Sequence, residues 1–139
     1  MNLIVKIAMS VALLISFVPG FAQMPATCPD ISLIKDPSKP FTDPASGIVY
    51  TGFSYNRAPP ILPLTNYYWD STEINVNFDL LQCYYDGPTR FSISLFPFKG
   101  TPLKILGSTK WTNGSLGNQK CSLSSGGTRE TCLFEVKGL

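Results

Sequence analysis

Residues 72–98 constrain the fold more than any other part of the chain, because two strand-like runs flank a turn within one short stretch. This stretch has the sequence TEINVNFDLLQCYYDGPTRFSISLFPF. Residues 86–89, Asp-Gly-Pro-Thr, have the composition of a tight turn. Apolar and polar side chains alternate on both sides of it, which is the period of a half-buried β-strand. The sequence therefore predicts a central β-hairpin.

The alternation also predicts which side chains of the hairpin face the core. In the first half, residues 73–80, the expected inward side chains are Ile74, Val76, Phe78 and Leu80. The phase slips at Leu80-Leu81, which predicts a β-bulge. Beyond the slip the inward candidates are Leu81, Cys83 and Tyr85, and after the turn they are Phe91, Ile93 and Leu95.

Residues 1–22 are interpreted as a cleaved signal peptide. Lys6 precedes an apolar run over residues 7–18, then Pro19-Gly20 interrupts it and small residues lead to Ala22. The run is shorter than the roughly 20 residues that a membrane-spanning helix needs. We therefore expect a periplasmic or secreted protein whose residues 23–139 form a single β-domain with no membrane span after cleavage.

All four cysteines lie in the predicted mature chain, at positions 28, 83, 121 and 132. An even number of cysteines in an exported protein predicts two disulfides, for which there are three possible connectivities. We favour Cys28–Cys83, which would attach the N-terminal arm to the central strand, together with Cys121–Cys132, which would close a Gly- and Ser-rich loop. A metal site is disfavoured, because the chain has no histidine and no Cys-x-x-Cys pair.

The rest of the chain favours an all-β fold. Strands are predicted within residues 47–55, 103–106, 109–112 and 131–136, with Gly52 marking a bulge or a close backbone approach. No segment has a sustained helical period, and the chain contains 12 prolines and 11 glycines. The predicted fold is a small antiparallel β-sandwich or open barrel around the central hairpin. Residues 57–63, RAPPILP, are interpreted as a rigid polyproline connector, and a docking motif is the less favoured alternative.

Four aromatic residues are candidate ligand contacts: Tyr67, Tyr68, Trp69 and Trp111. Adjacent residues of a strand point to opposite faces, so one or two of the first three should be exposed. With Trp111 they would form a stacking platform for a sugar ring or a partner protein. The favoured alternative is that they cap a small core or cover a sheet edge.

The available side chains argue against catalysis. Without histidine, the Ser-His-Asp and Cys-His mechanisms are excluded. Two close pairs of carboxylates remain, Asp70 with Glu73 and Asp79 with Asp86, and a weak glycosidase built on them is a distant alternative. We expect no enzyme activity, no cofactor and no metal. The 11 basic and 9 acidic residues are scattered, so nucleic acid is not an expected partner.

Short sequence motifs surround the cysteines in a particular order, namely Cys28-Pro29, Cys83-Tyr84-Tyr85, Trp111, Cys121 and Cys132-Leu133-Phe134. The order of these motifs resembles that in a family of short exported bacterial proteins of unknown function. The resemblance covers nearly all of the predicted mature chain. It implies a bacterial source and disulfides that serve as framework, but no activity, cofactor or catalytic residue.

These observations lead to a hypothesis of a non-catalytic binding or interaction module whose partner is an extracytoplasmic protein or glycan. The alternative is a protein inhibitor of a cell-wall-lytic enzyme. Small periplasmic lysozyme inhibitors are also disulfide-stapled antiparallel β-domains, and the hairpin of residues 78–95 is similar in style to theirs.

Overall fold

The structure, a computed structural model, describes residues 25–95, 103–107 and 110–136. The predicted signal peptide lies outside these residues, as do Pro97, Phe98 and Thr109 of the predicted strands. Within the described part every regular element is a β-strand or a single-turn 3₁₀-helix. No helix there is long and apolar enough to cross a membrane.

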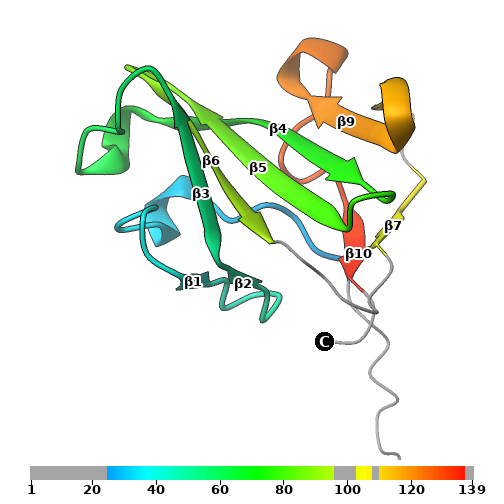
Figure 1. The fold of residues 1–139 in the computed structure, drawn as a ribbon, viewed down its shortest axis with the longest axis horizontal. Coiled ribbons are helices and arrows are strands. Elements are labelled where there is room, and N and C mark those ends of the chain that lie inside the picture. Colours follow the sequence, from blue (N-terminus) through cyan, green and yellow to red (C-terminus); the bar gives the residue numbers. More distant parts are fainter. Residues whose placement is uncertain (1–24, 96–102, 108–109, 137–139) are drawn as a thin grey trace, which may run out of the picture.

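The largest element is a six-stranded sheet in which every pair of neighbours is antiparallel (Figure 1). Its strands, in spatial order, are β3 (Gly52–Asn56), β6 (Arg90–Leu95), β5 (Leu80–Asp86), β4 (Tyr68–Asn75), β9 (Asn118–Ser122) and β8 (Trp111–Asn113). The prediction of an all-β antiparallel fold around a central hairpin is confirmed, because β5 and β6 pair through the turn predicted at residues 86–89.

A smaller second layer covers one face of this sheet. It contains two short antiparallel pairs, β1 (Phe41–Thr42) with β2 (Val49–Tyr50) and β7 (Leu103–Ile105) with β10 (Phe134–Val136). The 3₁₀-helices are η1 (Ile31–Leu33), η2 (Leu64–Asn66), η3 (Ser115–Gly117) and η4 (Leu123–Ser125). Figure 1 shows the N-terminal segment, β1, β2 and β10 on the same side of the six-stranded sheet. We call this covered side the inner face.

The inner face carries the apolar core. The predicted inward residues Cys83, Tyr85 and Phe91 are buried, and the rings of Tyr85 and Phe91 stack with centroids 5.2 Å apart. The Tyr85 hydroxyl donates a 2.6 Å hydrogen bond to the carbonyl of Pro29. This bond satisfies a buried polar group and attaches the N-terminal segment to the sheet.

The inward assignment of Val76 and Phe78 is wrong. Strand β4 ends at Asn75, and residues 76–79 form the turn into β5, so Val76 is 44% exposed and Phe78 is 59% exposed. The turn is held by the Asn75 side chain, which accepts a 3.1 Å bond from the N–H of Asn77. Apolar residues happen to keep the strand period through this turn, so periodicity alone could not detect it.

Two smaller expectations around the same hairpin also need correction. Leu80 is only half-buried and alternates with the core residue Leu81, so it lies on the opposite face. The register irregularity lies in β4, between Trp69 and Ser71, rather than at Leu80-Leu81. Asp70 is therefore the extra residue of a β-bulge in β4.

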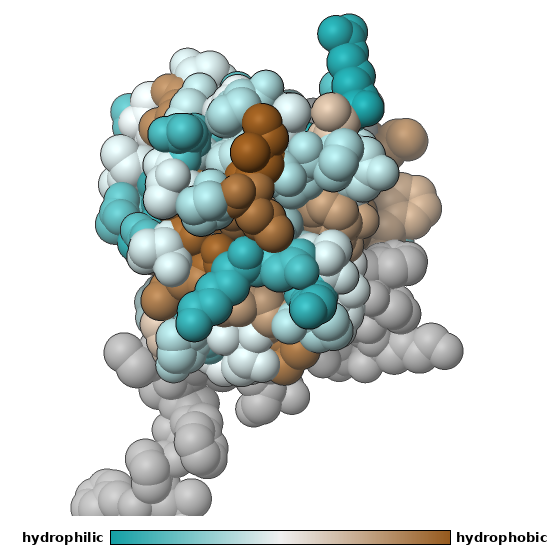
Figure 2. All heavy atoms as spheres, turned by 90° about the vertical axis from the view of Figure 1, so that its left-hand side faces the viewer, coloured by the Kyte–Doolittle hydropathy of each residue, from teal (hydrophilic) through white to brown (hydrophobic). Residues whose placement is uncertain are grey.

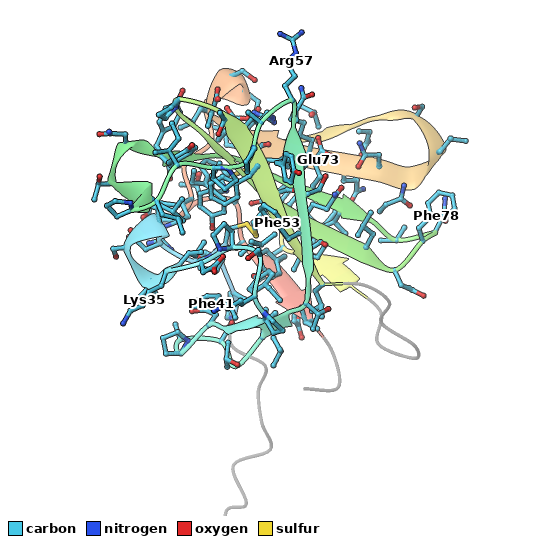
Figure 3. All side chains as sticks on the ribbon, turned by 60° about the vertical axis from the view of Figure 1, so that its left-hand side comes forward. Lys35, Phe41, Phe53, Arg57, Glu73 and Phe78 are labelled. Atoms are coloured by element: carbon cyan, nitrogen blue, oxygen red, sulfur yellow. A yellow bond between two sulfur atoms is a disulfide. The ribbon has the colours of Figure 1, made fainter. Side chains whose placement is uncertain are left out.

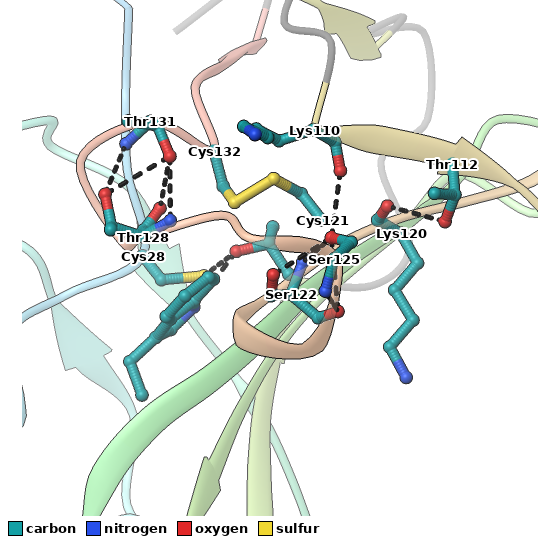
Figure 4. Close-up of a disulfide and its surroundings, with 12 residues drawn as sticks. Cys28, Lys110, Thr112, Lys120, Cys121, Ser122, Ser125, Thr128, Thr131 and Cys132 are labelled. Atoms are coloured by element: carbon teal, nitrogen blue, oxygen red, sulfur yellow. Dashed lines mark hydrogen bonds between the residues drawn. A yellow bond between two sulfur atoms is a disulfide. The ribbon is translucent and has the colours of Figure 1, made fainter.

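The predicted connectivity of the cysteines is confirmed. Cys28–Cys83 and Cys121–Cys132 are both bonded, and Figure 4 shows the second disulfide beside η4 and β9. Thr72 lies between Cys83 and Cys121 in the sheet register. Its hydroxyl accepts from the Trp69 indole at 3.1 Å. Two disulfides are consistent with an oxidising, extracytoplasmic environment.

The predicted strand over residues 47–55 is divided in two. β2 ends at Tyr50 and β3 begins at Gly52, and the two belong to different sheets. Gly52 is confirmed as a close backbone approach, because a Cβ at this position would overlap the Ser94 hydroxyl of the neighbouring strand. In the C-terminal strand, the phase that buries Cys132, Phe134 and Val136 is the one observed.

Candidate binding face

The face of the six-stranded sheet opposite the core is polar, and we call it the outer face. Its side chains are those out of phase with the buried inner residues of each strand. Among them are Ser54, Asn56, Asp70, Glu73, Asn75, Gln82, Tyr84, Arg90, Ser92 and Lys120. Leu80 also lies on this face and is apolar. A polar sheet face left uncovered by the second layer is the candidate functional surface.

Two hollows lie on the outer face. The first hollow has a volume of about 360 Å³ and lies over β6. It is lined by Ser54, Tyr55, Asn56, Tyr84, Arg90, Phe91 and Ser92.

The second hollow has a volume of about 280 Å³ and lies over the end of β4. It is lined by Glu73, Asn75, Leu80, Gln82, Ser115, Leu116 and Asn118. Strand spacing and residue rise place the centres of the two hollows roughly 15 Å apart. A ligand that fills both must be an extended molecule.

Four charged groups of the outer face form two ion pairs. The Arg90 guanidinium lies 2.7 Å from the Asp70 carboxylate, and the Lys120 ammonium lies 3.6 Å from that of Glu73. Arg90 also covers the ring of Tyr84, with its guanidinium carbon 4.9 Å from the ring centroid. The charged residues that line the two hollows, Arg90 and Glu73, are therefore each paired with an opposite charge. A further carboxylate of this face, that of Asp86, lies at the end of β5.

Tyr84 lies at the centre of the outer face, between the two hollows. Its hydroxyl donates a 2.9 Å hydrogen bond to the Oε1 atom of Gln82. Partial burial, with a smaller effect from the negative charge of Glu73, raises the pKa of Tyr84 to about 12. The hydroxyl is therefore neutral at physiological pH and can act as both donor and acceptor.

Several hydrogen-bonding groups around the hollows have no partner in the described part of the chain. The hydroxyl of the exposed Ser54 makes no hydrogen bond there, and neither do the two N–H groups of the partly buried Gln82 carboxamide. The hydroxyls of Ser92 and Ser71 also have no partner, but these residues are buried, with 3% and 0% exposure. The outer face thus offers the Ser54 hydroxyl and the Gln82 N–H groups to a polar ligand.

The predicted aromatic platform is not assembled. Tyr67 and Trp69 are buried, with the Tyr67 hydroxyl bonded to Thr89 and the Trp69 indole to Thr72. Tyr68 is 50% exposed, as the alternation predicted for one member of the cluster.

Trp111 is partly buried and packs against the core, and its indole nitrogen has no hydrogen-bond partner in the described residues. In the sheet register Trp111 is aligned with Cys121 and Thr72, which are inner-face positions, whereas Tyr68 precedes the buried Trp69 and points to the opposite side of the sheet. Tyr68 and Trp111 therefore do not share a surface. Tyr84, which does lie at the candidate site, was missed, although its position between inward Cys83 and Tyr85 already indicated that it points outward.

The two predicted carboxylate pairs differ in their arrangement. Asp79 and Asp86 lie at opposite ends of β5, roughly 20 Å apart by residue rise. Asp70 and Glu73 each face a cation instead. In the part of the chain that the structure describes, no cluster of three or more metal-ligating side chains is present.

One exposed apolar surface of the molecule lies on the connector between β3 and β4. The connector between β3 and β4, which contains the predicted polyproline segment, exposes Ile61 and Leu62. Figure 2 views the molecule from this side and shows a column of apolar side chains among hydrophilic ones. The connector and the outer face are thus surfaces of opposite character.

The fold and the face together define a disulfide-linked all-β domain with a polar sheet surface. Comparison of the chain with protein-family models, with curated proteins and with solved structures finds no match.

Proposed function

We propose that this protein is an exported, non-catalytic module that binds a neutral oligosaccharide on the outer face, in the periplasm or outside the cell. The main observation behind this proposal is that one sheet face combines two polar hollows with hydrogen-bonding groups that have no partner in the described residues. The charged residues that line these hollows form ion pairs within the face. The resemblance of the motifs around the cysteines to an exported bacterial family supports a bacterial source. The two disulfides support an extracytoplasmic location.

The chemistry of the face favours sugars over other polar ligands. A saccharide hydroxyl both donates and accepts, which matches the Ser54 hydroxyl and the carboxamide of Gln82. An anionic or cationic ligand would have to compete with the Arg90–Asp70 and Lys120–Glu73 pairs. The spacing of the hollows favours a chain of several sugar units over a monosaccharide.

The proposal can be tested by calorimetry with neutral tetrasaccharides. We expect Ser54→Ala and Gln82→Ala each to weaken binding by about 3- to 10-fold, the value of one net hydrogen bond. Thr65→Ala, an exposed hydroxyl on η2 away from the outer face, is the matched control and should bind normally. Absence of binding to every neutral tetrasaccharide in a varied panel would exclude the proposal.

The alternative, an inhibitor of a cell-wall-lytic enzyme, is favoured by a different observation. The β4–β5 turn and η3 form an apolar tip in which Val76, Phe78 and Leu116 are exposed. The Asn77 carboxamide donates a 3.1 Å bond to the Leu116 carbonyl and joins the two loops. Figure 3 shows Phe78 projecting at the end of the molecule. Exposed apolar side chains on a braced tip are suited to insertion into a partner's cleft.

This alternative predicts stoichiometric inhibition. Titration of the protein into a lysozyme assay on cell-wall suspensions should abolish activity at a one-to-one ratio. A Val76→Ser, Phe78→Ser double variant should lose inhibition while it keeps the oligosaccharide affinity, because neither side chain lines a hollow. Unchanged lysozyme activity at a large excess of protein would exclude the inhibitor for that enzyme.

A further inference from the structure

We infer that the second hollow binds the acetamido group of an N-acetylated sugar unit, so that the preferred ligand is an N-acetylhexosamine oligosaccharide. This inference rests on the proposed function and adds the substrate class. The two hollows differ in composition. Only the second combines aliphatic side chains, those of Leu80 and Leu116, with carboxamides. An acetamido group needs both, because it joins a methyl group to a hydrogen-bonding amide.

The apolar wall of the second hollow comes from two separate elements. Leu80 is the first residue of β5 and is half-buried, whereas Leu116 on η3 is 77% exposed. Leu80 and Asn118 lie on either side of Asn75 in the sheet register, so β5 and β9 are roughly 10 Å apart across the hollow. Both leucines line this hollow. Burial of a ligand methyl there would also remove apolar surface of Leu116 from water.

The polar wall supplies the complementary hydrogen bonds. The oxygens of the Gln82 and Asn75 side chains already accept bonds from Tyr84 and from the Asn77 N–H. Their N–H₂ groups therefore remain to donate to the carbonyl of an acetamido group. The amide N–H of the ligand would donate to the Glu73 carboxylate or to the Ser115 hydroxyl, which both line the hollow.

The backbone at Leu116 is a second observation that marks the hollow. Leu116 has φ +58°, in the left-handed region that leucine rarely occupies. The Asn77 side chain holds it there through the bond to its carbonyl. A glycine would adopt this conformation without steric cost, but it would have no side chain over the hollow. We propose that the leucine is a specificity-determining residue for the acetyl methyl.

The test compares two ligands that differ only in the acetamido group. Chitotetraose and cellotetraose are both β-1,4-linked tetrasaccharides, and the first carries acetamido in place of the 2-hydroxyl. We expect chitotetraose to bind at least 10-fold more tightly in calorimetry. In saturation-transfer NMR, its acetyl methyl resonances should receive more saturation than the ring protons.

Two variants assign the preference to the second hollow. Leu116→Gly relaxes the backbone, so it should unfold at the same or a higher temperature than the wild type while the preference falls to about 2-fold or less. Ser54→Ala, in the first hollow, should weaken both tetrasaccharides equally and keep their ratio.

The outcomes separate the inference from the proposed function. Equal binding of the two tetrasaccharides, or tighter binding of cellotetraose, would overturn the acetamido inference and leave oligosaccharide binding intact. A preference that survives Leu116→Gly and also Leu80→Ser would remove the second hollow as its source. Binding of neither tetrasaccharide, nor of any other neutral oligosaccharide, would overturn both.

Discussion

The inner and outer faces of the six-stranded sheet are made by the same strands but have opposite chemistry. On the inner face, Cys83, Tyr85 and Phe91 are buried under the N-terminal segment and the second layer. On the outer face of the same strands, Tyr84 and Gln82 are only partly buried and border open hollows. Among the described residues the buried apolar contacts therefore lie on one side of the sheet, and the other side carries the hollows on which the proposed function rests.

This separation has a functional consequence. Substitutions on the outer face remove hydrogen-bonding groups without opening a cavity in the core, so they should affect binding more than stability. Substitutions on the inner face should do the reverse. The predictions below test this division, in order of decreasing expected effect on stability.

The largest expected effect is that of reducing the disulfides, whose half-cystines in the sheet, Cys83 and Cys121, both lie on the inner face. The bonds close loops with sequence separations of 55 and 11 residues. In the chain-entropy model they stabilise the domain by about 4 and 3 kcal/mol. We expect the reduced protein to melt many degrees lower in circular dichroism. A reduced form that melts within a degree or two of the oxidised form would contradict this role.

The next largest effect on stability is expected from truncation of an aromatic side chain in the core. Phe91 is buried between the rings of Tyr85 and Tyr67, with centroids 5.2 Å from each. Phe91→Ala should lower the free energy of unfolding by about 3 to 5 kcal/mol in urea titration. Ser54→Ala, on the outer face of the neighbouring strand, is the control and should change it by about 0.5 kcal/mol or less. Similar losses for both would contradict the division of the two faces.

High pH should weaken the fold through Tyr84, although this residue lies on the outer face. Its pKa is about 12 in the folded protein, against an ordinary value of 10.0. The stabilising contribution is therefore complete below pH 10 and is lost as the pH rises through 12. We expect the unfolding free energy of the wild type to fall relative to that of Tyr84→Phe between pH 10 and pH 12. If the difference between the two unfolding free energies does not change with pH, the Tyr84 hydroxyl is more exposed to solvent than the structure indicates.

The smallest expected effect is at the apolar tip. Phe78 is 59% exposed, so Phe78→Ala should leave the unfolding free energy within about 0.5 kcal/mol of wild type. Urea titration alongside Phe91→Ala compares an exposed and a buried phenylalanine directly. A loss of several kcal/mol would show that the turn contributes to the core after all.

Much of the inner face could be predicted from the sequence. The positions of Leu81, Cys83 and Tyr85 follow from alternation, and the expectation of two disulfides follows from an even number of cysteines in a chain interpreted as exported. The choice among the three connectivities was a preference that the sequence alone does not determine. The candidate site was predicted far less well. Tyr67 and Trp69 resemble a ligand platform in sequence, but they are buried because η2 and the β4 bulge turn them inward.

Local pattern determined that the chain is all-β, which side chains of β5 and β6 point inward, and where their hairpin turns, because these depend on neighbours along the chain. Tertiary structure decided that residues 76–79 are a turn, that residues 47–55 are divided between two sheets, that Asp70 is a bulge, and that the second layer leaves one sheet face uncovered. It also brought Leu80 and Leu116 to one hollow. These features depend on strand register and on the packing of distant segments, which adjacent residues do not encode.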